Sequence, residues 1–117
     1  MPRSKTNRRL LGSEAEARVR RHFRLRGYRI VAANEWVGGN ELDLVVRRGR
    51  RLVFLEVKAK SGSDFGDAWE AVDPEKARRV RRAAEAWLAA RPALAELDVA
   101  LEAVAVRGRR LERTPLG

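Results

Sequence analysis

The sequence contains no cysteine, and His22 is its single histidine. Without cysteine there is no disulfide framework, no zinc ribbon and no catalytic thiol. A lone histidine also argues against a zinc site with several histidine ligands and against a serine-histidine-aspartate triad with a second histidine to spare. These absences exclude several common classes of small secreted protein and enzyme.

Long hydrophobic runs are also absent, because no stretch approaches the roughly 20 apolar residues that a membrane-spanning helix needs. The basic start, residues 1–9, is followed by too short an apolar stretch for a signal peptide. The chain has 117 residues, of which 44% are hydrophobic and 36% charged, a composition typical of one globular domain. We therefore expect a cytoplasmic protein without a membrane segment.

Positive charge dominates the composition: 26 Lys and Arg stand against 16 Asp and Glu, a net charge of +10. The excess lies near the amino terminus, where residues 1–29 hold ten basic and two acidic side chains. A basic segment of this kind favours a polyanionic partner, because each neutralised phosphate releases a condensed counterion. Codon bias toward arginine is the alternative explanation, since arginine greatly outnumbers lysine.

Periodicity and turn residues predict a single α/β domain at residues 11–117, preceded by a flexible basic arm at 1–10 without periodicity. The order of elements is α-β-β-β-α-β-β. We expect a helix at 13–26, strands at 28–33, 41–46 and 52–58, a helix at 74–90, and strands at 99–106 and 109–113.

Capping residues set the expected ends of the two helices. Ser13 and Glu16 fit a capping box at the start of the first helix, and Gly27 fits its stop. Asp73 and Pro74 fit the N-cap and first position of the second helix.

The strands at 41–46 and 52–58 carry an unusual set of charges on an apolar background. Because side chains alternate along a strand, Glu41 and Asp43 share one face of the earlier strand. Glu56 and Lys58 share one face of the later strand. A hairpin that keeps these faces together places all four charges on one side of the pair.

The register of this hairpin decides which charges meet. We predict a turn over residues 47–51, because a slip by one residue would separate the acids and bury charge. The predicted pairs are Val46 with Arg51, Asp43 with Phe54 and Glu41 with Glu56.

Carboxylates this close repel one another and raise one another's pKa unless a cation intervenes. A hard divalent ion with oxygen ligands, such as Mg²⁺, would remove that repulsion. A lysine two residues beyond Glu56 could orient a water or stabilise charge on a phosphate. The pattern therefore indicates metal-dependent phosphodiester hydrolysis. The alternative is an exposed strand face with weak cross-strand ion pairs.

A resemblance to a known family supports the first interpretation. The sequence resembles the bacterial YraN family of small predicted endonucleases, which are distantly similar to archaeal Holliday junction resolvases. The similarity covers roughly residues 11–106 and rests on six stretches: 12–16, 27–30, 33–34, 40–44, 52–58, and 70–72 with Lys76 and Arg79.

The resemblance implies a restriction-endonuclease-like fold, a mixed sheet flanked by helices, with a PD-(D/E)xK active site. It implies that Asp43 and Glu56 are the motif acids, that Lys58 is the motif lysine, and that Glu16 is the acid of the first helix. Glu41 is a further candidate. We expect Asp43 and Glu56 to hold Mg²⁺ or Mn²⁺ with the backbone carbonyl of Val57.

Other residues have two interpretations each. Glu16 is either part of the capping box or a member of the site, since it lies on the same helical face as Val19 and Phe23. Lys76 and Arg79 either contact phosphates or belong to a solvated helix face. In the basic arm, Arg8 and Arg9 are the predicted phosphate contacts.

We therefore predict a metal-dependent endonuclease that acts on nucleic acid, with DNA preferred. The alternative is a nucleic-acid-binding module that keeps the fold without catalysis. A basic assembly protein for ribonucleoprotein contacts is a third hypothesis. A homodimer is expected by analogy with junction-cutting relatives.

Overall fold

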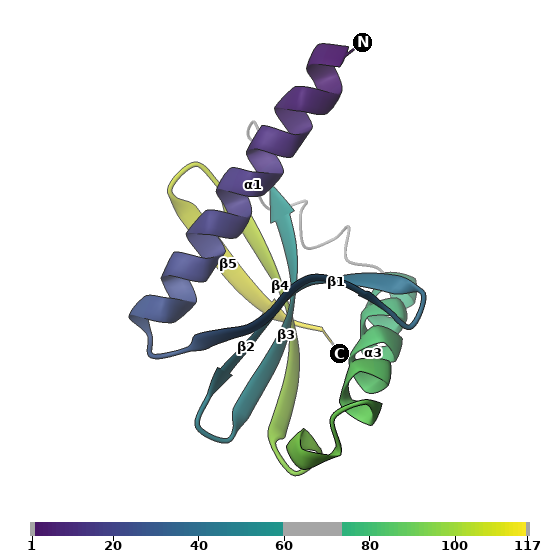
Figure 1. Cartoon of the computed structure of the whole chain (residues 1–117). Helices are drawn as coiled ribbons and strands as arrows, with labels where there is room; N and C mark the ends of the chain where they lie inside the picture. The colour runs from purple at the N-terminus through teal and green to yellow at the C-terminus, as the bar shows by residue number, and fades with distance from the viewer. Residues whose placement is uncertain (1, 60–73, 117) are drawn as a thin grey trace.

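The computed structural model describes residues 2–59 and 74–116, with side chains from Ser13 onward. The element order agrees with the predicted order, and one short 3₁₀ turn is added (Figure 1). The elements are α1 (Pro2–Leu25), β1 (Arg29–Val37), β2 (Asn40–Arg48), β3 (Arg51–Ala59), α3 (Pro74–Ala89), η1 (Pro92–Leu94), β4 (Asp98–Arg107) and β5 (Arg110–Pro115).

The strands form one five-stranded sheet in the order β1-β2-β3-β4-β5. β3 and β4 are parallel, and the other neighbouring pairs are antiparallel, so the sheet is mixed as predicted. The parallel pair requires a crossover connection, and α3 lies within it. The fold is thus a small α/β domain with a mixed sheet and two helices.

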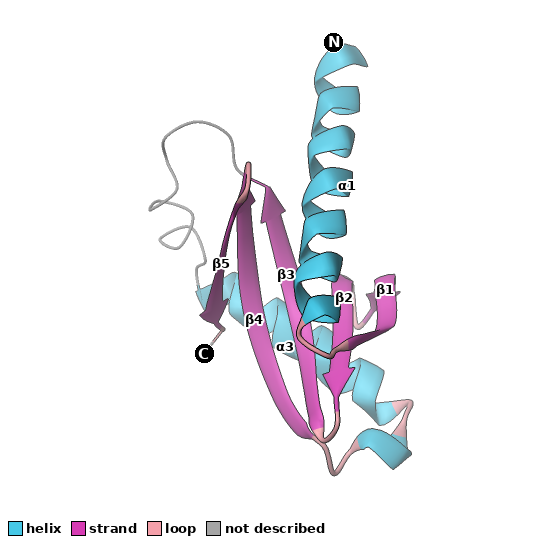
Figure 2. Ribbon diagram, turned by 90° about the vertical axis from the view of Figure 1, so that its left-hand side faces the viewer, coloured by secondary structure: helices cyan, strands magenta, loops and turns pink. Residues whose placement is uncertain are grey.

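The two helices pack on different core clusters (Figure 2). On the α1 side, Val19 and Phe23 are fully buried with Val53 and other strand residues. On the α3 side, Trp87 is buried against Phe54, with ring centroids 5.5 Å apart in an edge-to-face contact. In the part of the chain that the structure describes, no helix has the length and apolar character to span a membrane.

The start of α1 differs from the prediction. The helix begins at Pro2, not near Ser13, so the capping box at Ser13 and Glu16 is wrong. Proline is well suited to the first turn of a helix, and the arginines, lysine and leucines that follow have high helix propensity. Figure 1 shows this basic part of α1 extending past the sheet.

The register of the β2–β3 hairpin also differs from the prediction. Arg48, not Val46, pairs with Arg51, which shifts the register by two residues. A tight turn at residues 49–50 causes the shift, because Gly49 adopts a φ of 59° that favours glycine. A shift of two keeps the alternation of faces, and it moves Asp43 from opposite Phe54 toward Glu56.

Candidate active site

Asp43 and Glu56 meet where the backbone pairing of β2 and β3 ends. The last paired residues at this end are Leu44 and Leu55, so the next step along both strands sets Asp43 against Glu56. The Val57 N–H donates to Asp43 Oδ2 at 2.8 Å. Beyond the last backbone pair, this hydrogen bond to a side chain holds the two strands together. It also fixes the Asp43 carboxylate beside β3.

Asn34 brings two further acids to the same place. Its amide nitrogen, in the orientation that satisfies both carboxylates, lies 3.0 Å from Glu16 Oε1 and 3.2 Å from Glu41 Oε1. Asn34 has a φ of 51°, a left-handed conformation that asparagine tolerates better than most residues. Glu16 therefore belongs to this acid cluster, which we define as Glu16, Glu41, Asp43 and Glu56.

Asn34 is a site residue that the sequence does not predict. It lies in one of the family-like stretches, and a strand pattern does not reveal a left-handed residue within a strand. The sequence signal for this role is weak: an asparagine, which is depleted in strands, directly follows the predicted strand at 28–33.

The acid cluster perturbs the ionisation of Asp43. The pKa of Asp43 is raised from 3.8 to about 7, with burial as the largest cause. The nearby carboxylates of Glu56, Glu16 and Glu41 contribute to this rise, and the Val57 N–H acts in the opposite direction. Asp43 therefore holds its proton to a much higher pH than an ordinary aspartate does. A partly buried acid among three others is typical of a functional site.

Lysines from two elements border the cluster. Lys76 of α3 forms an ion pair with Glu56, with Nζ 3.1 Å from Oε1. Burial opposes the charge on Lys76, but the Glu56 carboxylate raises its pKa above the ordinary value. Lys58 of β3 also interacts with Lys76. The two lysines and the acids thus form one electrostatic unit at this end of the sheet.

The remaining predicted contacts lie outside the cluster. Arg79 is exposed on α3, and the side chains of Arg8 and Arg9 are outside those described. Their proposed contact with phosphates stays a prediction. The structure thus brings together Glu16, Glu41, Asp43, Glu56, Lys58 and Lys76 of the predicted site residues.

The donor chemistry of the cluster fits a hard divalent cation, because carboxylate and carbonyl oxygens are the ligands that Mg²⁺ and Mn²⁺ prefer. Asp43, Glu56 and the Val57 carbonyl are the set that would hold it. Among residues 13–59 and 74–116, no three acidic or histidine side chains already meet in metal-binding geometry. A cation held by two carboxylates, one carbonyl and waters requires only two side chains.

The fold and the site define a small α/β domain with a carboxylate–lysine cluster at the end of a central hairpin. Residues 15–108 match the model of the family described as "Uncharacterised protein family UPF0102". The chain belongs to this family, which confirms the predicted relationship to YraN-like proteins. The matched region includes all six residues gathered at the site.

Individual relatives agree with this assignment. A UPF0102 protein of Dechloromonas aromatica (strain RCB) is 40% identical over 101 residues, which cover 86% of this chain and 82% of the relative. A UPF0102 protein of Methylorubrum extorquens (strain PA1) is 43% identical over 102 residues, which cover 87% of this chain and 78% of the relative.

Proposed function

We propose that this protein is a metal-dependent endonuclease that hydrolyses phosphodiester bonds in nucleic acid, with DNA preferred. The site would be of the PD-(D/E)xK type on a restriction-endonuclease-like fold. The observation that carries the proposal is the convergence of Asp43 and Glu56 at the end of the β2–β3 hairpin, with Lys58 and Lys76 beside them.

Each residue has a role that follows from its surroundings. Asp43, Glu56 and the Val57 carbonyl would hold the cation. A bound Mg²⁺ or Mn²⁺ would supply a water of lowered pKa and polarise the phosphate. Lys58 would orient the attacking water and stabilise negative charge on the phosphate. Asn34 positions Glu16, whose carboxylate lies 3.0 Å away.

The electrostatics of the cluster favour this assignment. Burial is the largest cause of the raised pKa of Asp43, and repulsion from the neighbouring carboxylates adds to it. A divalent cation would offset this repulsion far better than a single lysine. The net charge of +10 supports a polyanionic substrate, which the acids alone would repel.

The alternative function is a nucleic-acid-binding module without catalysis. The ion pair between Lys76 and Glu56 favours it, because Glu56 already has a cationic partner, as in a purely structural ion pair. Metal-dependent turnover separates the two functions.

The test is a cleavage panel on duplex, flap, junction and single-stranded substrates, each with and without Mg²⁺ or Mn²⁺. We expect metal-dependent cleavage by the wild type and none by Asp43→Ala or Glu56→Ala. Glu75→Ala is the matched control, because Glu75 is an exposed acid on α3 whose contact with Arg78 spans 4.0 Å. Its activity should equal that of the wild type.

Lys58→Ala should retain metal affinity and lose rate, since lysine acts on the water and on developing charge. An inactive wild type on every substrate, or equal cleavage by the Asp43 and Glu56 variants, would contradict the nuclease proposal.

A further inference from the structure

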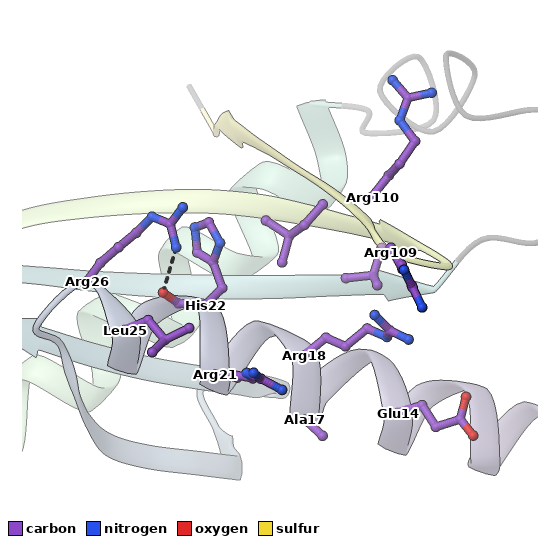
Figure 3. Close-up of a pocket in the computed structure, with 11 residues that line it drawn as sticks. Glu14, Ala17, Arg18, Arg21, His22, Leu25, Arg26, Arg109 and Arg110 are labelled. Atoms are coloured by element: carbon purple, nitrogen blue, oxygen red, sulfur yellow. Dashed lines mark hydrogen bonds between the residues drawn. The ribbon is translucent and has the colours of Figure 1, made fainter.

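A second charged surface lies between α1 and the β4–β5 hairpin. It is an open groove of about 640 Å³ (Figure 3). Five arginines line it, against a single acid, Glu14. The arginines are Arg18, Arg21 and Arg26 of α1 and its end, and Arg109 and Arg110 of the β4–β5 turn.

Two arginines of this groove point toward each other although they carry the same charge. Figure 3 shows the ends of Arg18 and Arg109 directed toward one another across the groove. Within residues 13–59 and 74–116, Arg18, Arg21 and Arg109 form no ion pair with an acid. Guanidinium groups that approach each other without an intervening carboxylate create a site of strong positive potential.

His22 adds an unsatisfied polar atom to the wall of the groove. Its Nε2 is buried and has no hydrogen-bond partner among the described residues. Burial and the charges of Arg26 and Arg113 lower the pKa of His22, so the ring is neutral at physiological pH. A neutral imidazole adds no charge, so the positive charge of the groove comes from its arginines.

The groove and the acid cluster lie on opposite flanks of α1. Residues of a helix are 100° apart, so Arg18 projects about 200° away from Glu16. Glu16 lies toward Asn34 of β1, whereas Arg18 lines the groove beside β4 and β5. The helix therefore separates a surface that repels phosphates from one that attracts them.

We propose that this groove binds the sugar–phosphate backbone of nucleic acid at a place separate from the reaction site. Planar guanidinium groups bind phosphate oxygens through paired hydrogen bonds, and an open groove admits successive phosphates of one strand. The inference shares its ligand class with the proposed function, but it does not depend on catalysis.

The test compares two double variants with the same change in net charge. Arg18→Ala/Arg109→Ala removes the convergent pair. Arg24→Ala/Arg82→Ala removes two arginines that are exposed and outside the groove. Binding of a short labelled DNA duplex is measured by fluorescence anisotropy over a range of salt, with EDTA present to prevent cleavage. Thermal melts check that both variants fold.

We expect the groove variant to lose about tenfold in affinity and its log–log salt slope to become shallower by about 1.8, at 0.9 per lost phosphate contact. The control should change both values much less. Equal losses for the two double variants would overturn the proposal, and so would a wild type that binds no DNA at low salt.

Two further arms identify the ligand and separate this inference from the nuclease. In the first arm, polyglutamate and unlabelled DNA of equal charge compete with the labelled duplex. If polyglutamate displaces the duplex as effectively as the DNA does, the groove binds an acidic protein partner and the proposal is overturned. Asp43→Ala should bind the duplex at least as tightly as the wild type. A groove effect without metal-dependent cleavage would support the groove while contradicting the nuclease.

Discussion

Glu102 and Asp43 are both carboxylates withdrawn from solvent on this sheet, Glu102 buried and Asp43 half-buried, and their surroundings differ. Glu102 of β4 is only 6% exposed, and it accepts from Arg113 Nε at 2.7 Å and Nη2 at 2.9 Å. Arg51 adds a longer contact of 3.5 Å. Asp43 instead has a backbone N–H as its partner and lies among other acids, including Glu56.

The two carboxylates differ in role: Glu102 stabilises the fold, whereas Asp43 belongs to the candidate site. Arg113 also lies over the Phe23 ring, 4.6 Å from its centroid, so the Glu102 pair is part of the α1 core. Its charges are matched within the fold. In the acid cluster Glu56 forms an ion pair with Lys76, while burial and mutual repulsion raise the pKa of Asp43. A site that stores such repulsion fits an external cation.

The largest expected effect is on cleavage. Asp43→Asn keeps the shape of the side chain but removes the anionic ligand, so we expect turnover to fall about a thousandfold or more, equal to about 4 kcal/mol in the barrier. The measurement is single-turnover cleavage under saturating Mg²⁺. Glu102→Gln should cleave at close to the wild-type rate whenever it is folded.

For folding stability, we expect that loss of the Glu102 carboxylate destabilises the protein, although its loss hardly affects cleavage. Glu102→Ala leaves Arg113 partly buried without its carboxylate, and we expect a loss of about 2–3 kcal/mol. Chemical denaturation measures this loss, with Glu112→Ala on β5 as the control. If Glu102→Ala proved as stable as the wild type, the comparison between the two carboxylate sites would fail.

The pH dependence of stability sharpens the comparison further. In the unfolded chain Asp43 ionises near 3.8, whereas in the fold it keeps its proton until about pH 7. The unfolded state therefore binds fewer protons in that window, and metal-free stability falls as pH rises through it. Asp43→Asn should be more stable than the wild type by on the order of 4 kcal/mol at about pH 8, and equal to it below about pH 4. Denaturation in EDTA at both pH values checks the sign.

The smallest expected effect concerns Asn34. Asn34→Gly allows the same left-handed backbone but removes the amide that positions Glu16 and Glu41, so cleavage should fall by about tenfold. Asn34→Ala adds backbone strain and should also lower stability. Wild-type activity in Asn34→Gly would show that the amide has no positioning role.

Most of the fold could be predicted because its signals are local. Pro74 correctly predicted the start of a helix, whereas the predicted N-cap Asp73 lies outside the described residues. The alternation of charged and apolar residues predicted β2 and β3. The convergence of Asp43 with Glu56 survived an incorrect register, because a shift of two residues preserves the faces.

The rest depends on contacts that no local pattern encodes. The length of the turn at Gly49 set the register, and the helix propensity of residues before Ser13 overrode an apparent cap. The Glu102–Arg113 pair joins two strands through the core, and Asn34 acts through a single left-handed residue. Such features follow from tertiary packing.

The most direct test of the central claim is an NMR titration of the Asp43 carboxyl carbon with and without Mg²⁺. Without the ion, we expect a pKa of about 7, from burial and neighbouring acids. Saturating Mg²⁺ should lower this pKa below its ordinary value of 3.8, because the ion binds only the carboxylate form. A titration that Mg²⁺ leaves unchanged would contradict the assignment of the acid cluster as a cation site.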